Sequence, residues 1–320
     1  MLNPKKSQFY CSLILRTFDE LINYINNVSQ GWLIRFIHSN GASLFFMCAY
    51  MHIGKALFYR SYEIVGVWFT GIFIFFILIG TAFLGYVLPW GQMSYWGATV
   101  ITNLISVVPF IGSQIVEWLW GGFNIHNATL TRFYTFHFLL PFLIVLIAVT
   151  HLVLLHTKGS SNPLGLGSSI DKITFSPFFF VKDLISLIIF TALFFSLIYL
   201  NPLLFFDVEN FINRNPMVTP LHIQPEWYFL FAYAILRSIP RKLGGVIMLV
   251  LSISILAFMP LVNFKKIKGL LFTPIKGFIL IFHLGTFFFL TYLGRIVVEY
   301  PYTFLRGCYT LIYFLSFLII

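Results

Sequence analysis

Six long stretches of this 320-residue chain are apolar and almost free of charge, and they constrain the fold more than any other feature. A bilayer core of about 30 Å is crossed by a helix of about 20 residues. Lipid offers no hydrogen-bond partner to backbone groups, so segments of this kind cross it as helices. The stretches are residues 64–88, 138–155, 181–200, 243–264, 277–293 and 302–320.

A further helix starting near Arg35 brings the expectation to about seven transmembrane helices in an all-α integral membrane fold. Charged residues make up only 9% of the chain, against about 25% in soluble domains. The alternative, a large soluble all-α core, is therefore disfavoured. We expect an N-terminal segment without a full span (1–30), a first helical bundle (31–165) and a C-terminal helical region (166–320).

The net charge of +10 raises the alternative of a nucleic-acid partner, but the basic residues do not form one patch. The densest basic run, residues 264–268, falls between two predicted spans and is typical of a loop at a phosphate-rich membrane surface. No nucleic-acid partner is expected. The three cysteines lack metal-ligand spacing; they are Cys11, Cys48 and Cys308.

Counting crossings predicts which connections share a membrane face. The two long connections, 89–130 and 201–242, both leave the membrane on the face where the first span begins, which we call side one. A Gly/Ser/Asn/Pro-rich loop at 159–169 lies on the opposite face, side two. Because both elaborate loops meet on side one, a functional site is expected there.

Four of the eight histidines form two pairs with one spacing: His38 with His52, and His137 with His151, each pair fourteen residues apart. Fourteen residues are nearly four helical turns, so each pair lies on one helix face with roughly 21 Å between its members. One span separates the two helices, so they run parallel, and His38 is level with His137, His52 with His151. This pattern predicts two b-type haems, each with two axial histidines.

Zinc binding and a hydrogen-bonding role are the two alternatives to haem for these histidines. Zinc requires a third or fourth ligand at each level, and the sequence suggests none. Buried histidines also serve as hydrogen-bonding residues or as a proton relay. Two pairs with the same spacing on parallel helices favour haem over both.

Gly71 and Gly85, on the intervening span, are also fourteen residues apart. Glycine lets a flat ring approach the backbone, although glycine is also a common packing residue in membrane helices. Arg35 and Lys55 lie three residues outside His38 and His52 and can reach haem propionates. Snorkelling to the membrane surface is the alternative for these two side chains.

Five ordered motifs resemble the mitochondrial-type cytochrome b of the quinol-oxidising cytochrome bc1 complex, respiratory complex III. The resemblance runs from about residue 18 to the end of the chain. The motifs are residues 32–43, 85–103, 136–142, 159–165 and 225–240.

The resemblance implies that quinol is oxidised on side one and quinone is reduced on side two, with electrons passing across both haems. It implies a low-potential haem b at His38 and His137, a high-potential haem b at His52 and His151, and ubiquinone as substrate. The implied partners are a Rieske iron–sulfur protein, cytochrome c1 and other complex III subunits in a homodimer. The implied location is the mitochondrial inner membrane.

The resemblance also implies roles for residues on both faces. Glu226 accepts a quinol proton, with capping of the following helix as the alternative. The other residues matched to the quinol site are Tyr86, Gly97, Tyr228 and Tyr233. The residues matched to the quinone-reduction site are His156, Ser160 and Asp183. The remaining histidines are expected to be ordinary polar residues, chiefly facing loops; they are His126, His222 and His283.

One departure concerns the family's first transmembrane helix, since only about 18 residues precede the stretch that matches from Asp19, and the apolar run at 9–15 is too short to span. We expect that helix to be lost, separately encoded, or replaced by another subunit packed near Gly71 and Gly85. Lys55 stands where the family usually has arginine. The rival functions are a cytochrome b6, a transporter with buried histidines, and a cytochrome b remnant without turnover.

Overall fold

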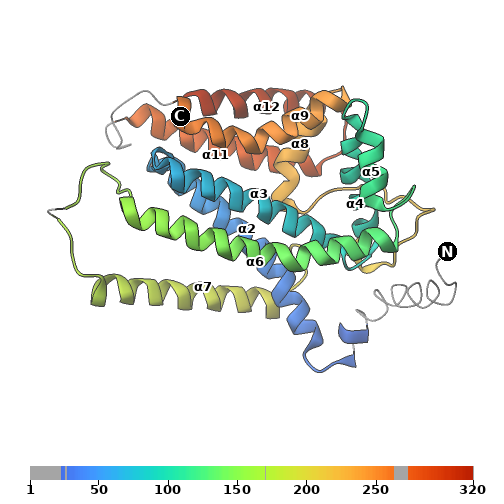
Figure 1. The fold of residues 1–320 in the computed structure, drawn as a ribbon, viewed down its shortest axis with the longest axis horizontal. Helices are drawn as coiled ribbons and strands as arrows, with labels where there is room; N and C mark the ends of the chain where they lie inside the picture. Colours follow the sequence, from blue (N-terminus) through green and yellow to red (C-terminus); the bar gives the residue numbers. More distant parts are fainter. Residues whose placement is uncertain (1–22, 26, 170, 263–272, 320) are drawn as a thin grey trace.

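The computed structural model describes residues 23–25, 27–169, 171–262 and 273–319, and the apolar run at 9–15 therefore lies outside the described residues. Within the described part the elements are helices (Figure 1). Seven of them are long and apolar enough to cross a membrane, which confirms the predicted fold class. The seven are α2 (Gly31–Phe58), α3 (Val65–Val87), α6 (Asn127–Lys158), Phe175–Leu200 with α7 (Phe180–Leu200), Lys242–Leu261 with α9 (Lys242–Ser254), α11 (Pro274–Arg295) and α12 (Tyr302–Ile319).

Four of the six predicted stretches agree with a span to within three residues at each end, whereas Phe175–Leu200 begins six residues before position 181 and Asn127–Lys158 eleven residues before position 138. α2 begins at Gly31 and α6 at Asn127, each four residues before the expected start. The first turn of α6 contains Asn127 and Thr129, so apolar runs alone do not reveal where that helix begins. Pro141 lies inside α6, as membrane helices permit when neighbouring groups satisfy the freed carbonyl.

The helices form a continuous packed body in which α3 lies along α6 and α8 (Leu230–Ser238) lies between α9, α11 and α12 (Figure 1). One apolar core includes Trp68 of α3, Ile235 of α8 and Leu290 of α11. The indole N–H of Trp68 donates a 2.7 Å hydrogen bond to the carbonyl of Leu256. This contact ties α3 to the segment that follows α9.

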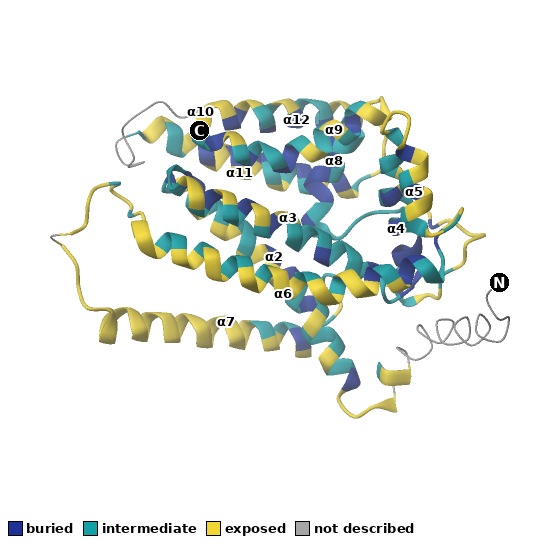
Figure 2. Cartoon of the chain, in the orientation of Figure 1, coloured by how far each residue is buried: buried dark blue, intermediate teal, exposed yellow. Residues whose placement is uncertain are grey.

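α7 packs against α2 and is otherwise exposed along nearly its whole length (Figure 2). Its exposed side chains are mainly leucine, isoleucine and phenylalanine. Lipid tails are as apolar as these side chains, so exposure carries no penalty for a helix in a bilayer.

The two long connections meet at one end of the helices, as the count of crossings predicted. The first contains α4 (Gln92–Asn103) and α5 (Gly112–Trp120), and the second leads into α8. The backbone N–H of Gln92 donates to the carbonyl of Ile212 at 2.9 Å, and the Gln92 side-chain oxygen accepts from the N–H of Asn215 at 2.6 Å. The two long connections therefore form one continuous surface on side one.

The buried side chain of Asn210 also joins the two long connections, and its loss is the first testable change. The Asn210 side-chain oxygen accepts two hydrogen bonds of 2.9 Å from the N–H and the hydroxyl of Ser94. Asn210→Ala leaves the buried Ser94 N–H without this acceptor, while the Ser94 hydroxyl keeps the Tyr86 carbonyl at 2.6 Å, so we expect the unfolding free energy to fall by about 1–3 kcal/mol. Thermal denaturation of the purified complex measures this. Asn124→Ala is the control, because Asn124 is an exposed asparagine of the same face; equal stability of the two variants contradicts the prediction.

Candidate functional site

The structure brings each of the four histidines to the partner predicted from spacing. The ring centroids of His38 and His137 are 6.1 Å apart, and those of His52 and His151 are 6.4 Å apart. Two imidazoles on opposite sides of one metal, each bound at about 2 Å, have ring centroids roughly 6 Å apart. Both pairs therefore fit a six-coordinate iron held between α2 and α6.

Threonines of α3 hold the two histidines of α6. His137 Nδ1 lies 2.8 Å from the carbonyl of Thr81, which can only accept, so Nδ1 carries the proton. His151 Nδ1 lies 3.0 Å from the hydroxyl of Thr70, whose own proton points to backbone carbonyls one turn earlier. Each bond leaves Nε2 free as a metal ligand and orients the ring.

The two glycines of α3 make room for these same rings. A Cβ added at Gly85 would lie 2.8 Å from Nδ1 and 3.1 Å from Nε2 of His137. A Cβ added at Gly71 would lie 3.2 Å from Cε1 of His151. Among the protein groups, the flat ring against each glycine is an imidazole, and the approach of a porphyrin to these glycines stays a prediction.

On side one, the His38–His137 pair opens into a cavity of about 450 Å³. This volume falls within the range of roughly 300–1,000 Å³ that is usual for ligand pockets. Arg35 lines the cavity, and its guanidinium also lies 5.0 Å from the ring centroid of Phe211. A cation beside an imidazole pair suits a haem propionate. The other lining residues that matter here are Gly85, Tyr86, Asp207, Glu226 and Tyr228.

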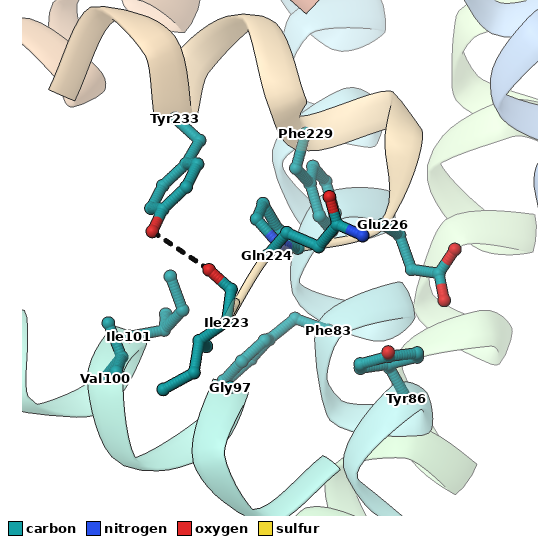
Figure 3. A pocket seen from close by; sticks show the side chains of 11 residues that line it. Phe83, Tyr86, Gly97, Val100, Ile101, Ile223, Gln224, Glu226, Phe229 and Tyr233 are labelled. Carbon is teal, nitrogen blue, oxygen red and sulfur yellow. Dashed lines mark hydrogen bonds between the residues drawn. The ribbon is translucent and has the colours of Figure 1, made fainter. Parts of the chain in front are cut away.

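A second, narrower pocket lies beside this cavity (Figure 3). It has a volume of about 30 Å³, so a substrate ring enters only if side chains move. Glu226 and Tyr86 line both spaces and lie together at one side of the narrow pocket, opposite Tyr233. The lining comes from α3, α4, the second long connection and α8: Phe83, Tyr86, Gly97, Val100, Ile101, Ile223, Gln224, Pro225, Glu226, Phe229 and Tyr233.

Burial, and then the negative charge of Asp207, raise the pKa of Glu226 to about 8. A carboxyl group with this pKa can take up and release a proton near neutral pH. Glu226 precedes the short 3-10 turn Trp227–Phe229, but its side chain makes no capping hydrogen bond there. The capping alternative is therefore not supported.

The three tyrosines assigned to the quinol site do not share one location. Tyr86 and Tyr233 line the narrow pocket. Tyr228 lines only the His38–His137 cavity, which Tyr86 also lines, and its ring stacks on Phe46 with centroids 4.0 Å apart. Burial and the charge of Glu226 raise the pKa of Tyr228 well above its ordinary value, so this phenol keeps its proton.

On side two, a cavity of about 690 Å³ lies between the turn after α2 and the loop after α6. Ser160 lines this cavity together with Arg60 and Lys158. His156 and Asp183 are exposed on α6 and α7 and do not line it. The structure therefore does not gather these three predicted residues into one cavity.

Lys55 and the remaining histidines are placed as follows. Lys55 is exposed, with Nζ 5.9 Å from the ring centroid of Tyr59. His126 precedes α6, where its backbone N–H donates a 3.3 Å hydrogen bond to the hydroxyl of Thr129, and His222 lies in the second long connection. His283 corrects an expectation: it is not a loop residue but is buried in α11, where Nδ1 lies 2.7 Å from the hydroxyl of Ser316 on α12.

Comparison with known proteins agrees with this arrangement. Residues 6–159 match the family model Cytochrome b/b6/petB, and residues 213–314 match Cytochrome b(C-terminal)/b6/petD. A chain of a solved structure described as "Hyperthermophilic respiratory Complex III" is similar, with a TM-score of 0.90 and 31% sequence identity. That match covers 95% of this chain and 82% of the other. This multi-pass membrane chain belongs to the cytochrome b family.

Proposed function

We propose that this chain is the cytochrome b subunit of a quinol–cytochrome c oxidoreductase. One observation carries the proposal: Glu226 and Tyr86 line both the narrow pocket and the cavity of the His38–His137 pair. A group that faces both spaces can receive a proton in one and release it toward the other.

The narrow pocket is the side-one quinol site. Its wall is mostly apolar, with Phe83, Val100 and Ile101 excluding water from the substrate ring. Glu226 in its anionic form accepts the proton of a quinol hydroxyl. Rotation of its side chain toward the side-one cavity then carries the proton away from the product quinone. Tyr86 lines both spaces beside Glu226, so the Glu226 side chain rotates past the Tyr86 ring.

Two haems b serve as cofactors, the low-potential one at His38 and His137 and the high-potential one at His52 and His151. When bound, they supply one-electron transfer from side one to side two. The chain contributes the imidazoles, the threonine bonds that orient those on α6, and glycines that admit the rings. Arg35 on side one and Lys55 on side two offer positive charge to propionates.

Quinone reduction takes place on side two, near His156, Ser160 and Asp183. These three side chains are exposed on side two, so a closed site there requires further residues, cofactor or lipid to cover them. The partners we assign are a Rieske iron–sulfur protein, cytochrome c1 and other complex III subunits in a homodimeric complex. The corresponding location is the mitochondrial inner membrane, and the net effect contributes to proton translocation.

Glu226→Gln tests the proton-accepting role. With a pKa of about 8, Glu226 is mostly protonated below that pH and cannot accept a proton, so wild-type quinol oxidation rises as pH increases toward and through 8. The glutamine variant keeps the size of the side chain but has no basic form. We expect its rate to fall about tenfold or more, which is about 1.4 kcal/mol of barrier per tenfold, and its pH profile to lose that rise.

Two further variants control this measurement. Glu117→Gln removes an exposed carboxylate of α5 on the same face and is expected to keep the wild-type profile. Asp207→Asn removes a negative charge that raises the Glu226 pKa, so the rise should move to lower pH. Normal turnover of Glu226→Gln at every pH, with full haem content, would show that the assignment of Glu226 is wrong.

A further inference from the structure

The wall of the narrow pocket opposite Glu226 depends on Tyr233. Its hydroxyl donates a 3.2 Å hydrogen bond to the carbonyl of Ile223, and both residues line the pocket (Figure 3). This bond joins α8 to the segment that leads into Glu226. The position of the Tyr233 ring therefore sets the separation between two parts of the pocket wall.

Arg237 lies one helical turn after Tyr233 on α8, and its guanidinium carbon is 5.0 Å from the centroid of the Tyr233 ring. Residues four apart on a helix are neighbours on its surface. A guanidinium at this distance from an aromatic face is attracted to it, and more strongly where water is excluded. Arg237 Nη1 is buried, and no described residue accepts a hydrogen bond from it. The aromatic face is thus a contact that compensates this charge.

A second arginine favours that placement of Arg237. Arg306 of α12 is fully buried. Its Nε donates to the carbonyl of Leu293 at 3.1 Å, and its Nη2 donates to those of Ile296 at 2.6 Å and Val297 at 2.8 Å. These three bonds at the end of α11 fix the guanidinium.

Arg306 lies close enough to Arg237 for their like charges to interact. Because like charges repel, the fixed charge of Arg306 disfavours positions of Arg237 close to α12. The face of Tyr233 attracts the same guanidinium. Repulsion and attraction therefore act together to hold Arg237 against the ring.

We propose that Arg237 is a positioning residue for the narrow pocket: its guanidinium holds the Tyr233 ring, and through it the Ile223 carbonyl, in the geometry that binds quinol. The inference rests on the proposed function of that pocket. Arg237 touches neither substrate nor cofactor in this role, so its loss affects substrate binding more than the chemical step.

The test is quinol-oxidation kinetics of the assembled complex carrying Arg237→Met, a side chain of similar length without charge. We expect the KM for quinol to rise about fivefold to tenfold while kcat changes less than twofold and haem spectra stay normal. A rise in KM at constant kcat reports lost binding without lost transition-state stabilisation. Arg237→Lys keeps the cation and should recover most of the affinity.

Arg214→Met is the matched control. Arg214 makes the same kind of contact on the same face, 5.0 Å from the Trp90 ring centroid and 5.6 Å from that of Tyr95. Neither of these two rings lines the pocket, whereas the Tyr233 ring does. The KM of Arg214→Met should equal that of the wild type. Equal KM values for Arg237→Met and Arg214→Met overturn the inference.

A second background keeps the inference testable if Arg237→Met alone assembles poorly. In a Tyr233→Leu protein the ring is absent, so adding Arg237→Gln should leave KM where Tyr233→Leu put it. A further increase of similar size in that background means that Arg237 acts without Tyr233, which also overturns the inference. Failure of the proposed function gives a different result, because turnover is then insensitive to Glu226→Gln.

Discussion

Replacing His52 with alanine is expected to remove one of the two b-haem signals and to leave the other in place. His52 faces His151 with ring centroids 6.4 Å apart, while the other pair is separate and level with side one. Without His52 an iron between these helices keeps only His151, which its bond to Thr70 holds in place. A six-coordinate low-spin site cannot form from one histidine.

The measurement is a dithionite-reduced minus oxidised spectrum of the purified complex, with haem counted per chain. We expect about half the low-spin signal and a fall in turnover of about 100-fold or more, which is about 2.7 kcal/mol. His283→Ala is the control: His283 is also a buried histidine of a spanning helix, but its partner is Ser316. It should keep both haems, and a His52→Ala protein that also keeps both would refute the pairing.

The sequence predicted the spans and the histidine pairs because both are encoded by simple distances. The length of an apolar run is set by bilayer thickness, and fourteen residues return a side chain to nearly the same helix face. Parallel direction follows from counting one span between α2 and α6. His38 and His137 could therefore be matched before any contact was known.

The threonine partners of the α6 histidines were not predicted. A threonine in a helix ordinarily bonds to a carbonyl one turn earlier, as Thr70 does with Gly66. Nothing in the sequence distinguishes Thr70 and Thr81 from such residues. The available signal is their position on α3: Thr70 adjoins Gly71, and Thr81 lies one turn before Gly85.

Two other placements depended on contacts between distant segments. His283 looked like any polar residue of the C-terminal region, and only the packing of α11 on α12 brings it to Ser316. Tyr228 follows Glu226 so closely that one shared site was expected. The two residues do share the larger cavity, but the 3-10 turn at Trp227–Phe229 directs the Tyr228 ring to Phe46 and away from the narrow pocket.

The two glycines of α3 should differ sharply when each is replaced by alanine. At Gly85 the new Cβ would overlap the His137 ring, with Nδ1 at 2.8 Å and a carbon, Cε1, closer still. Cβ atoms do not occupy such positions, so the ring must turn and lose its 2.8 Å bond to the Thr81 carbonyl. At Gly71 the nearest atom, Cε1 of His151, lies 3.2 Å away, and a shift of a few tenths of an ångström suffices.

Gly85→Ala is therefore expected to lose most of the haem at the His38–His137 level, whereas Gly71→Ala should keep both haems with a weakened side-two signal. Gly80→Ala on the same helix is the control, because a Cβ there meets nothing within 4 Å and haem content should match the wild type. A hydrogen-bond partner orients each histidine that ligates a metal. Loss of such a partner typically lowers metal affinity about 10–100-fold. Difference spectra of the three variants, titrated with haem, measure this order. If Gly85→Ala and Gly80→Ala bind haem equally well, the close contact between Gly85 and His137 does not control the site.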